Sequence, residues 1–285
     1  MSAIAETEQR PALIQIDKVS KTYVRNKALT YAIEDISFAV PAGEVVAIVG
    51  PSGSGKSTLL NMIAGLLRPT SGVVRYSGAP VAAVNTKVGY MTQHDTLLPW
   101  RTALANVRVA LEIQAVPRKD ADERARKALA DVGLEAFAKH YPTQLSGGMR
   151  KRVQLARTVV YNPQTLLMDE PFGALDAILR VNLQQDFLRL LATRAEPLTV
   201  VLVTHDLEEA VTMADQVIVL SGSPARVSHV ERLRGIREAA LSTGVVEARR
   251  SPEFGRYLNL LWNQLHLGRD LRGAGAPELR EEATR

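Results

Sequence analysis

Hydrophobic and polar residues follow two different patterns along this chain. In residues 13–40, apolar residues recur at alternate positions ("LIQIDKVS", "AIEDISFAV"), which predicts an antiparallel β layer. Continuous apolar runs occupy Val45–Val49 and residues 165–168, and a third run, "LTVVLVTH", ends at His205. Short runs of this kind are typical of strands buried on both faces of a sheet. Together the two patterns predict an α/β fold.

Residues between about 94 and 158 show helical periodicity instead. They contain "RTALANVRVALEIQ" and "DADERARKALADVGL", followed by "LSGGMRKRVQLAR", in which a basic, apolar-periodic helix follows two glycines. We expect Asp120 to cap the start of the middle helix and Gly133 to end it.

A further helix is predicted in "SPEFGRYLNLLWNQLHL", with Ser251 or Pro252 as its start signal. Its apolar face would carry Leu258, Leu261, Trp262 and Leu265. Because the helix is short and contains few lysines, we expect it to dock on the protein core and not on a membrane. Residues 268–285 are charged and rich in Gly and Ala, and we expect them to be disordered.

Composition narrows the class of protein. With 285 residues, 46% of them hydrophobic, the chain is long enough for one large or two small domains. There is no cysteine, which excludes disulfides and thiolate metal sites. No segment approaches the ~18 consecutive apolar residues of a membrane span, and the first residues lack the pattern of a signal peptide. A soluble cytoplasmic protein is the expectation. The net charge of +5 decides little, because 35 basic and 30 acidic residues are interspersed.

The strongest chemical motif is "GPSGSGKST", which fits G-x-x-x-x-G-K-[ST]. A predicted strand precedes it and a helical pattern follows it, as a phosphate-binding loop requires and a chance glycine-rich turn does not. Backbone N–H groups would surround the β-phosphate at the start of the helix, Lys56 would reach the β- and γ-phosphates, and the Ser57 hydroxyl would bind Mg²⁺. The predicted nucleotide-binding residues are Gly50, Pro51, Ser52, Gly53, Ser54, Gly55, Lys56, Ser57 and Thr58.

Candidate catalytic residues follow two other predicted strands. In "TLLMDEPFGALD", Asp169 would hold Mg²⁺ through water and Glu170 would polarise the attacking water. His205 would contact the γ-phosphate and orient the water. The alternatives are an ordinary acidic junction and a structural histidine, and the phosphate-binding loop favours the catalytic interpretation. The other histidines, His94, His140, His229 and His266, have no such context.

Taken together, these motifs resemble the ATP-binding subunits of ABC transporters over residues 13–220. "GPSGSGKST" is similar to the Walker A loop, "LLMDEP" to Walker B, "LSGGM" to the family signature and "ALD" to the D-loop. Gln93 matches the Q-loop, His205 the switch histidine and Tyr23 the aromatic residue that stacks on adenine. The resemblance implies a P-loop NTPase core with an antiparallel β layer and an inserted helical subdomain, about 94–158. The ABC ATPase domain would span 13–225, and residues 226–285 would form an extension with one amphipathic helix and the disordered tail.

The resemblance also explains the second glycine-rich motif. In the family, two chains dimerise head to tail, and each signature closes over the ATP held by the partner's P-loop. Ser146, Gly147 and Gly148 would supply this anion site at a helix start, and Asp176 of the D-loop is assigned to nucleotide contact. The basic side chains Arg150, Lys151 and Arg152 are interpreted as solvated and not catalytic. Met149 replaces the commoner glutamine, from which we expect weaker polar contact with the nucleotide without loss of activity.

The implied function is ATP hydrolysis that energises an importer, with ATP and Mg²⁺ as cofactors and Ser57, Gln93 and Asp169 around the metal. The implied partners are a second copy of the chain, two transmembrane permeases and, indirectly, a solute-binding protein, at the cytoplasmic face of the inner membrane. The residues of these motifs are most similar to those of the nitrate, sulfonate and taurine subgroup. The sequence of this chain does not identify the solute. Leu97, Leu98, Pro99 and Trp100 would either pack the helical subdomain or receive a helix of the permease.

Two other classes of P-loop protein share part of this pattern. A soluble ABC ATPase acting on DNA or ribosomes would need a long coiled coil or a second cassette, and the chain has one P-loop and no sustained heptad pattern. We therefore expect no nucleic-acid partner. A nucleotide kinase would share the P-loop but would leave the signature unexplained.

Overall fold

Two β-sheets carry the fold of the described residues, which are 11–25, 28–173 and 175–270 of the computed structural model. The larger sheet has six strands in the order β10-β9-β3-β8-β7-β6, with β10 antiparallel to β9 and the other neighbours parallel. Its strands are β3 (Val45–Val49), β6 (Val88–Met91), β7 (Thr165–Asp169), β8 (Thr199–Thr204), β9 (Gln216–Leu220) and β10 (Val227–Arg232). The buried apolar runs predicted from the sequence thus form the middle of this sheet.

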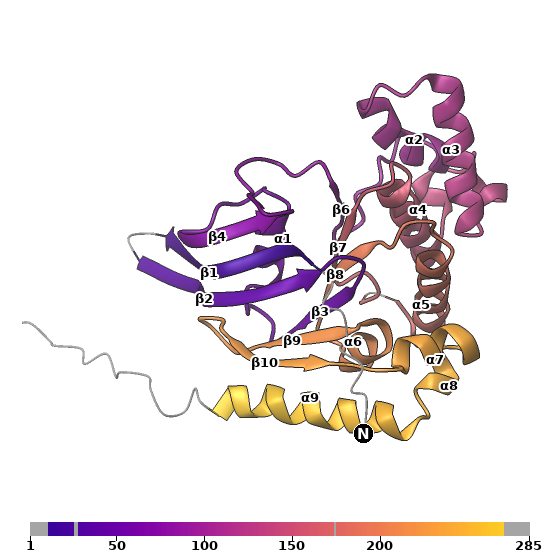
Figure 1. Cartoon of the computed structure of the whole chain (residues 1–285). Coiled ribbons are helices and arrows are strands. Elements are labelled where there is room, and N and C mark those ends of the chain that lie inside the picture. Colours follow the sequence, from indigo (N-terminus) through magenta and orange to yellow (C-terminus); the bar gives the residue numbers. More distant parts are fainter. Residues whose placement is uncertain (1–10, 26–27, 174, 271–285) are drawn as a thin grey trace, which may run out of the picture.

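The second sheet is antiparallel and has four strands in the order β2-β1-β4-β5. Its strands are β1 (Ala12–Arg25), β2 (Ala28–Pro41), β4 (Ser71–Tyr76) and β5 (Ala79–Pro80). Figure 1 shows it as the indigo and purple layer beside helix α1 (Lys56–Ile63). The alternating pattern of residues 13–40 therefore predicted this layer correctly.

The strand β3 separates two hydrophobic cores. Val46 and Ile48 face the antiparallel layer and α1, whereas Val45, Ala47 and Val49 face the core shared with the other helices. All five are fully buried, because side chains of a central strand alternate between two covered faces. This burial fixes the end of β3, from which the phosphate-binding loop starts.

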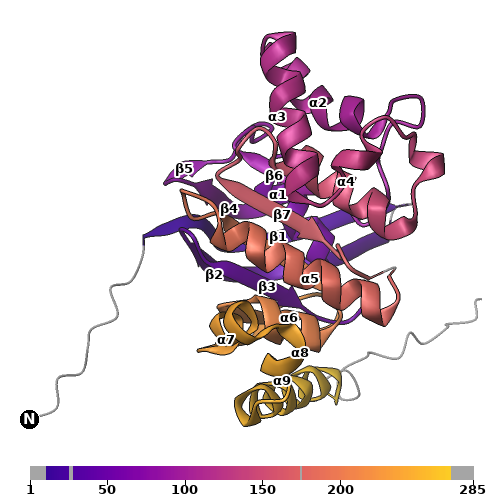
Figure 2. The same ribbon diagram turned by 90° about the vertical axis from the view of Figure 1, so that its right-hand side faces the viewer.

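Helices cover the other face of the large sheet and form a separate projection. Next to the sheet lie α5 (Ala177–Ala192) and α6 (Leu207–Met213). The helices α2 (Ala103–Ile113), α3 (Arg118–Asp131) and α4 (Gly147–Val159), with short 3₁₀ turns at Glu135–Phe137 and Pro142–Gln144, occupy the predicted helical segment. They lie at the top of Figures 1 and 2, away from the antiparallel layer.

The expected cap of the middle helix was wrong. Helix α3 begins at Arg118 after Pro117, so Asp120 lies inside its first turn and makes no cap. Proline fixes φ and has no N–H to leave unpaired, and both properties suit a helix start. Gly133 does follow the end of α3, with φ of 71°.

The C-terminal part contains more structure than the single helix expected. After β10 come α7 (Ile236–Thr243), α8 (Val245–Ala248) and α9 (Pro252–Asp270), and α9 runs beneath β9 and β10 (Figure 1). Leu261 of α9 is fully buried, but Trp262 is 57% exposed, so placing Trp262 on the docking face was wrong. Residues 268–270 continue α9, and the rest of the expected disordered tail lies outside the described residues. Within the described part of the chain, no helix is both long and apolar enough to cross a bilayer.

Candidate active site

The loop between β3 and α1 has the conformation that its glycines predict. Gly53 and Gly55 adopt φ of 78° and 76°, a region that favours glycine. Gly55 precedes α1, and no side chain caps this helix start. The first N–H groups of α1 are therefore left to bind an anion, which the helix dipole also favours.

Lys56 lies buried within this loop. Its ammonium group donates hydrogen bonds to the carbonyl oxygens of Gly50 and Pro51, at 2.9 and 2.8 Å. Burial lowers the pKa of Lys56, and the nearby carboxylates of Glu170 and Asp169 act in the opposite direction. The charged Lys56 side chain thus lies at the edge of the site, hydrogen-bonded to carbonyl oxygens of the loop.

Asp169 is the last residue of β7 and is buried. Burial raises its pKa, a hydrogen bond from Ser57 lowers it, and the adjacent charge of Glu170 raises it again. Ser57 of α1 and Asp169 of β7, the two residues predicted to hold Mg²⁺ from these elements, thus lie near each other.

Glu170 has the most constrained geometry in the site. Its φ is 46°, which is strained for a residue with a side chain, and its N–H donates to the Val203 carbonyl at 2.9 Å. The Gln93 amide donates to one carboxylate oxygen at 2.8 Å, and Nδ1 of His205 lies 3.1 Å from the other. The three predicted catalytic residues therefore meet. The Glu170 carboxylate lies between Gln93, which follows β6, and His205, which follows β8.

Most of these residues line one cavity of about 500 Å³, although Gly50, Pro51 and Asp169 are not among its lining residues. Its lining consists of Ala32, Ser52, Gly53, Ser54, Gly55, Lys56, Ser57, Thr58, Gln93, Glu170 and His205. The cavity opens at the carboxyl ends of β3, β7 and β8, where parallel sheets bind ligands.

The residues present fit a nucleotide phosphate group with its metal. Ser54 is one of the residues that line the cavity, and its hydroxyl is buried without a hydrogen-bond partner among the described residues, which leaves a polar group unsatisfied inside the phosphate-binding loop. Within the described residues, no group of three or more histidine or carboxylate side chains encloses a metal position. A site made of the Ser57 hydroxyl, the Asp169 carboxylate and the Gln93 amide oxygen suits Mg²⁺, which keeps waters and phosphate oxygens as its other ligands.

Other predicted site residues do not line this cavity. Tyr23 is a partly exposed residue of β1 with Lys21 Nζ 5.3 Å from its ring centre, and only Ala32 of the same sheet lines the cavity. Ser146 caps α4 by accepting from the Met149 N–H, and Asp176 caps α5 by accepting from the Leu179 N–H. Ser146, Gly147 and Asp176 are exposed on the surface.

The expectation that the basic side chains after the signature are solvated was wrong for Lys151. Lys151 is buried and donates to the Gln93 carbonyl at 2.6 Å, Arg150 pairs with Asp95 and Arg152 pairs with Asp186. The sequence contained a signal for the burial of Lys151, because Gly148, Lys151 and Leu155 recur at helical spacing and share one face of the helix. In the structure all three residues are buried. The charge of Lys151, by contrast, favours a solvated side chain.

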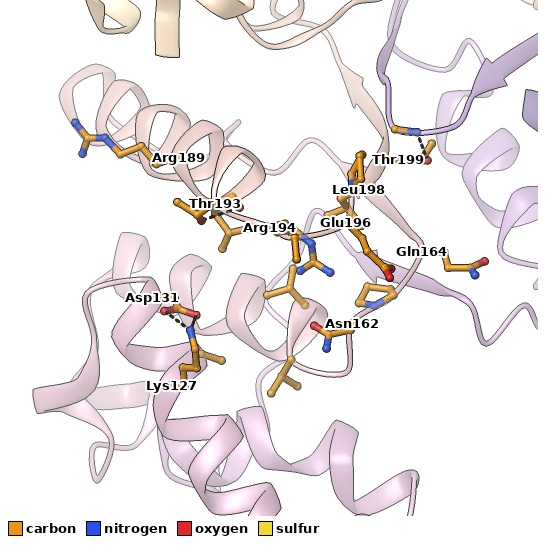
Figure 3. Close-up of a pocket in the computed structure, with 18 of the residues that line it drawn as sticks. Lys127, Asp131, Asn162, Gln164, Arg189, Thr193, Arg194, Glu196, Leu198 and Thr199 are labelled. Atoms are coloured by element: carbon orange, nitrogen blue, oxygen red, sulfur yellow. Dashed lines mark hydrogen bonds and ion pairs between the residues drawn. The ribbon is translucent and has the colours of Figure 1, made fainter. Parts of the chain in front are cut away.

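A larger groove of about 1280 Å³ opens at the other end of the strands (Figure 3). It lies between α3, the end of α5 and the segments that precede β7 and β8. Its lining includes the Lys127–Asp131 ion pair, Arg194, Gln164 and Thr199, and none of the predicted site residues.

Comparison with known proteins places the chain in a family whose members bind ATP. Residues 33–173 match the family described as ABC transporter. The chain is 44% identical over 223 residues to the taurine import ATP-binding protein TauB of Pseudomonas entomophila, covering 78% of this chain and 84% of that protein. It is 39% identical over 230 residues to the uncharacterized ABC transporter ATP-binding protein MJ0412 of Methanocaldococcus jannaschii, covering 81% and 85%.

A solved structure gives the same result. The ATP-binding cassette MJ0796, as a dimer in a post-hydrolysis state with ADP and Pi, superposes with a TM-score of 0.69 at 35% identity. The match covers 78% of this chain and 99% of that one. The chain belongs to the ABC transporter ATP-binding proteins.

Proposed function

We propose that this chain is the ATP-hydrolysing subunit of an ABC importer. The observation that carries the proposal is the Glu170 carboxylate, held between Gln93 and His205 at the edge of a P-loop cavity. A carboxylate with one fixed partner on each oxygen is oriented to take a proton from a water molecule. We also propose that residues 13–225 act as the catalytic domain.

In this mechanism the loop N–H groups and Lys56 bind the β- and γ-phosphates of ATP, with Lys56 exchanging loop carbonyls for phosphate oxygens. When bound, Mg²⁺ supplies charge neutralisation, and Ser57, Gln93 and Asp169 would hold it. Glu170 accepts the proton of the attacking water, and His205 orients that carboxylate and contacts the γ-phosphate.

The signature supports a head-to-tail dimer. Ser146 and Gly147 are exposed, and the lining of the chain's own P-loop cavity does not include them. Free N–H groups at the start of α4 form an anion site without a lysine of its own. We propose that this site meets the γ-phosphate on a second copy, as the dimeric form of the MJ0796 cassette suggests. Asp176 and Tyr23 are proposed to contact nucleotide in the same assembly, Tyr23 by stacking on adenine.

The proposed membrane partners are two permeases, with a solute-binding protein acting through them at the cytoplasmic face of the inner membrane. The apolar cluster after Gln93 divides into two parts, because Leu97 is buried in the core whereas Trp100 is 71% exposed. Trp100 is therefore available to a permease helix. The names of the TauB relatives favour taurine or a related sulfonate as solute, with nitrate as the other anion of this subgroup. They give no support to a DNA- or ribosome-acting ATPase.

Replacement of Glu170 by Gln tests the hydrolytic role. The amide keeps the shape of the side chain but cannot accept a proton, so we expect ATP binding to persist and turnover to fall on the order of 10²–10⁴-fold. Equilibrium binding of ATP and steady-state phosphate release would be measured on the same preparation. Glu253→Gln, an exposed carboxylate at the start of α9, is the control. Near-normal phosphate release by Glu170→Gln would refute the proposed role.

The transport assignment has its own test. Affinity purification of the chain from membranes solubilised in mild detergent should recover integral membrane proteins. Recovery of nucleic acid or ribosomes in place of membrane proteins would support the alternative function.

A further inference from the structure

Helix α4 makes several polar contacts with the segment that contains Gln93. We define residues 92–96 as the Q-loop segment. Gln154 donates to the Thr92 carbonyl at 3.2 Å and to the His94 carbonyl at 3.4 Å. Arg157 donates to the Thr96 carbonyl at 2.8 Å. One face of the helix therefore fixes the backbone of this segment at several points.

The contact nearest the site is the one between Lys151 and Gln93. The buried ammonium group of Lys151 donates to the Gln93 carbonyl at 2.6 Å, and a charged donor makes this hydrogen bond short and strong. Arg150, one residue earlier, pairs with Asp95 at 3.0 Å. Gln93 is thus held by its backbone from α4, while its side chain donates to Glu170 at 2.8 Å.

These contacts form a continuous connection within one chain. It begins at Ser146, the cap of α4, passes through the first turns of the helix to Lys151, and reaches Glu170 through Gln93. In the proposed head-to-tail dimer, Ser146 and Glu170 of one chain serve different nucleotides. The connection therefore joins the two ATP sites through the first turns of α4 and two hydrogen bonds, Lys151 to Gln93 and Gln93 to Glu170.

We propose that Lys151 is a positioning residue that transmits engagement of the signature by one nucleotide to the Gln93–Glu170 pair at the other. This inference rests on the proposed function, because it requires the signature to bind the partner's nucleotide. A shift or rotation of α4 on binding would move the Gln93 backbone with it, since the buried Lys151 ammonium group donates to the Gln93 carbonyl. Without the ammonium group, Gln93 would keep its contact with Glu170 but would lose its own direct hydrogen bond to α4.

Arg152 provides a matched control on the same helix. It carries the same charge one residue later, but it pairs with Asp186 of α5 at 2.9 Å and makes no hydrogen bond or ion pair with the Q-loop segment among the described residues. Lys151→Met removes the donor and keeps an unbranched side chain of similar length, and Arg152→Met removes the same charge outside the connection. Lys151→Arg retains a donor.

Hydrogen exchange followed by mass spectrometry separates binding from transmission. We would compare residues 50–58 and 92–96 in the wild type and the three variants, with and without Mg²⁺ and a non-hydrolysable ATP analogue. In the wild type both segments should become protected. In Lys151→Met, residues 50–58 should still be protected, whereas the protection of residues 92–96 should be lost. Arg152→Met should behave like the wild type, and Lys151→Arg should recover most of the protection.

Steady-state kinetics gives the second readout. We expect Lys151→Met to lower kcat roughly tenfold, to leave KM for ATP within about twofold, and to reduce the Hill coefficient towards one. Protection of residues 92–96 in Lys151→Met equal to that in the wild type would overturn the inference. If Lys151→Met does not fold, Gln154→Leu removes other contacts of the same face and should give the same selective loss. No protection of residues 50–58 in the wild type would instead refute the proposed function.

Discussion

Arg180 and Asp206 join two loops that the sequence separates. Their guanidinium and carboxylate groups lie 2.9 Å apart, and the same guanidinium donates to the Leu175 carbonyl at 3.1 Å. Leu175 precedes Asp176 of the D-loop, and Asp206 follows His205. Arg180 therefore holds the D-loop and the histidine loop of one chain together.

Loss of this pair should reduce turnover more than stability. Arg180→Met leaves Asp206 without its partner and frees the D-loop backbone, so we expect kcat to fall roughly tenfold. Arg189→Met on the same helix is the control, because Arg189 is 68% exposed and lies 3.8 Å from Asp186. Phosphate release and thermal unfolding of both variants would be measured. Equal kcat for the two variants would contradict the expectation.

The two signature glycines should respond differently to alanine. A Cβ at Gly148 would overlap the Leu179 side chain, whereas a Cβ at Gly147 would meet no atom within 4 Å. We expect Gly148→Ala to destabilise the fold by about 1–3 kcal/mol and Gly147→Ala to be neutral or stabilising in the first turn of α4. Urea unfolding of both variants checks this. Equal stability would mean that Leu179 moves aside.

Glu209 should make the folding stability depend on pH. Burial raises its pKa from the ordinary 4.5 to about 8, and the neighbouring Asp206 adds to the shift, while Thr204, Arg180 and Arg249 oppose it. The folded protein keeps this proton up to about pH 8, whereas the unfolded chain releases it near pH 4.5. The contribution to stability is therefore complete below pH 4.5 and is lost as the pH rises to 8.

Glu209→Gln should remove this dependence. The free energy of unfolding of the wild type, relative to this variant, should fall between pH 4.5 and about 8 by an amount of the order of a few kcal/mol. The exposed neighbour Glu208→Gln serves as control. A constant difference between wild type and Glu209→Gln over this pH range would show that the carboxyl group ionises normally.

The C-terminal helix should depend on Leu261 and not on Trp262. Leu261 is fully buried, so Leu261→Ala should cost about 2–5 kcal/mol, whereas Trp262→Ala should stay within about 0.5 kcal/mol. The Trp262 ring contacts His266, with centroids 4.5 Å apart, which is a surface contact. Comparison of the two variants in urea unfolding tests which face of α9 docks. A large loss with Trp262→Ala would contradict this assignment.

Local sequence was sufficient for the elements whose signals are local. The apolar run Val45–Val49, the glycines of the following loop and the helical pattern after Lys56 specify strand, loop and helix within a few residues. The alternation in residues 13–40 likewise predicted β1 and β2. These signals depend on backbone sterics and on side-chain period, which neighbouring residues determine.

Only the tertiary structure decided which side chains meet. The sequence assigned Gln93, Glu170 and His205 to one task, but their hydrogen bonds exist because β6, β7 and β8 end at one edge of the sheet. From the sequence, Lys151 was expected to be solvated. The charge of a side chain does not reveal that a carbonyl of a distant segment, here that of Gln93, lies beside it. Burial of a charged group depends on partners distant in sequence, and only the packed fold brings those partners together.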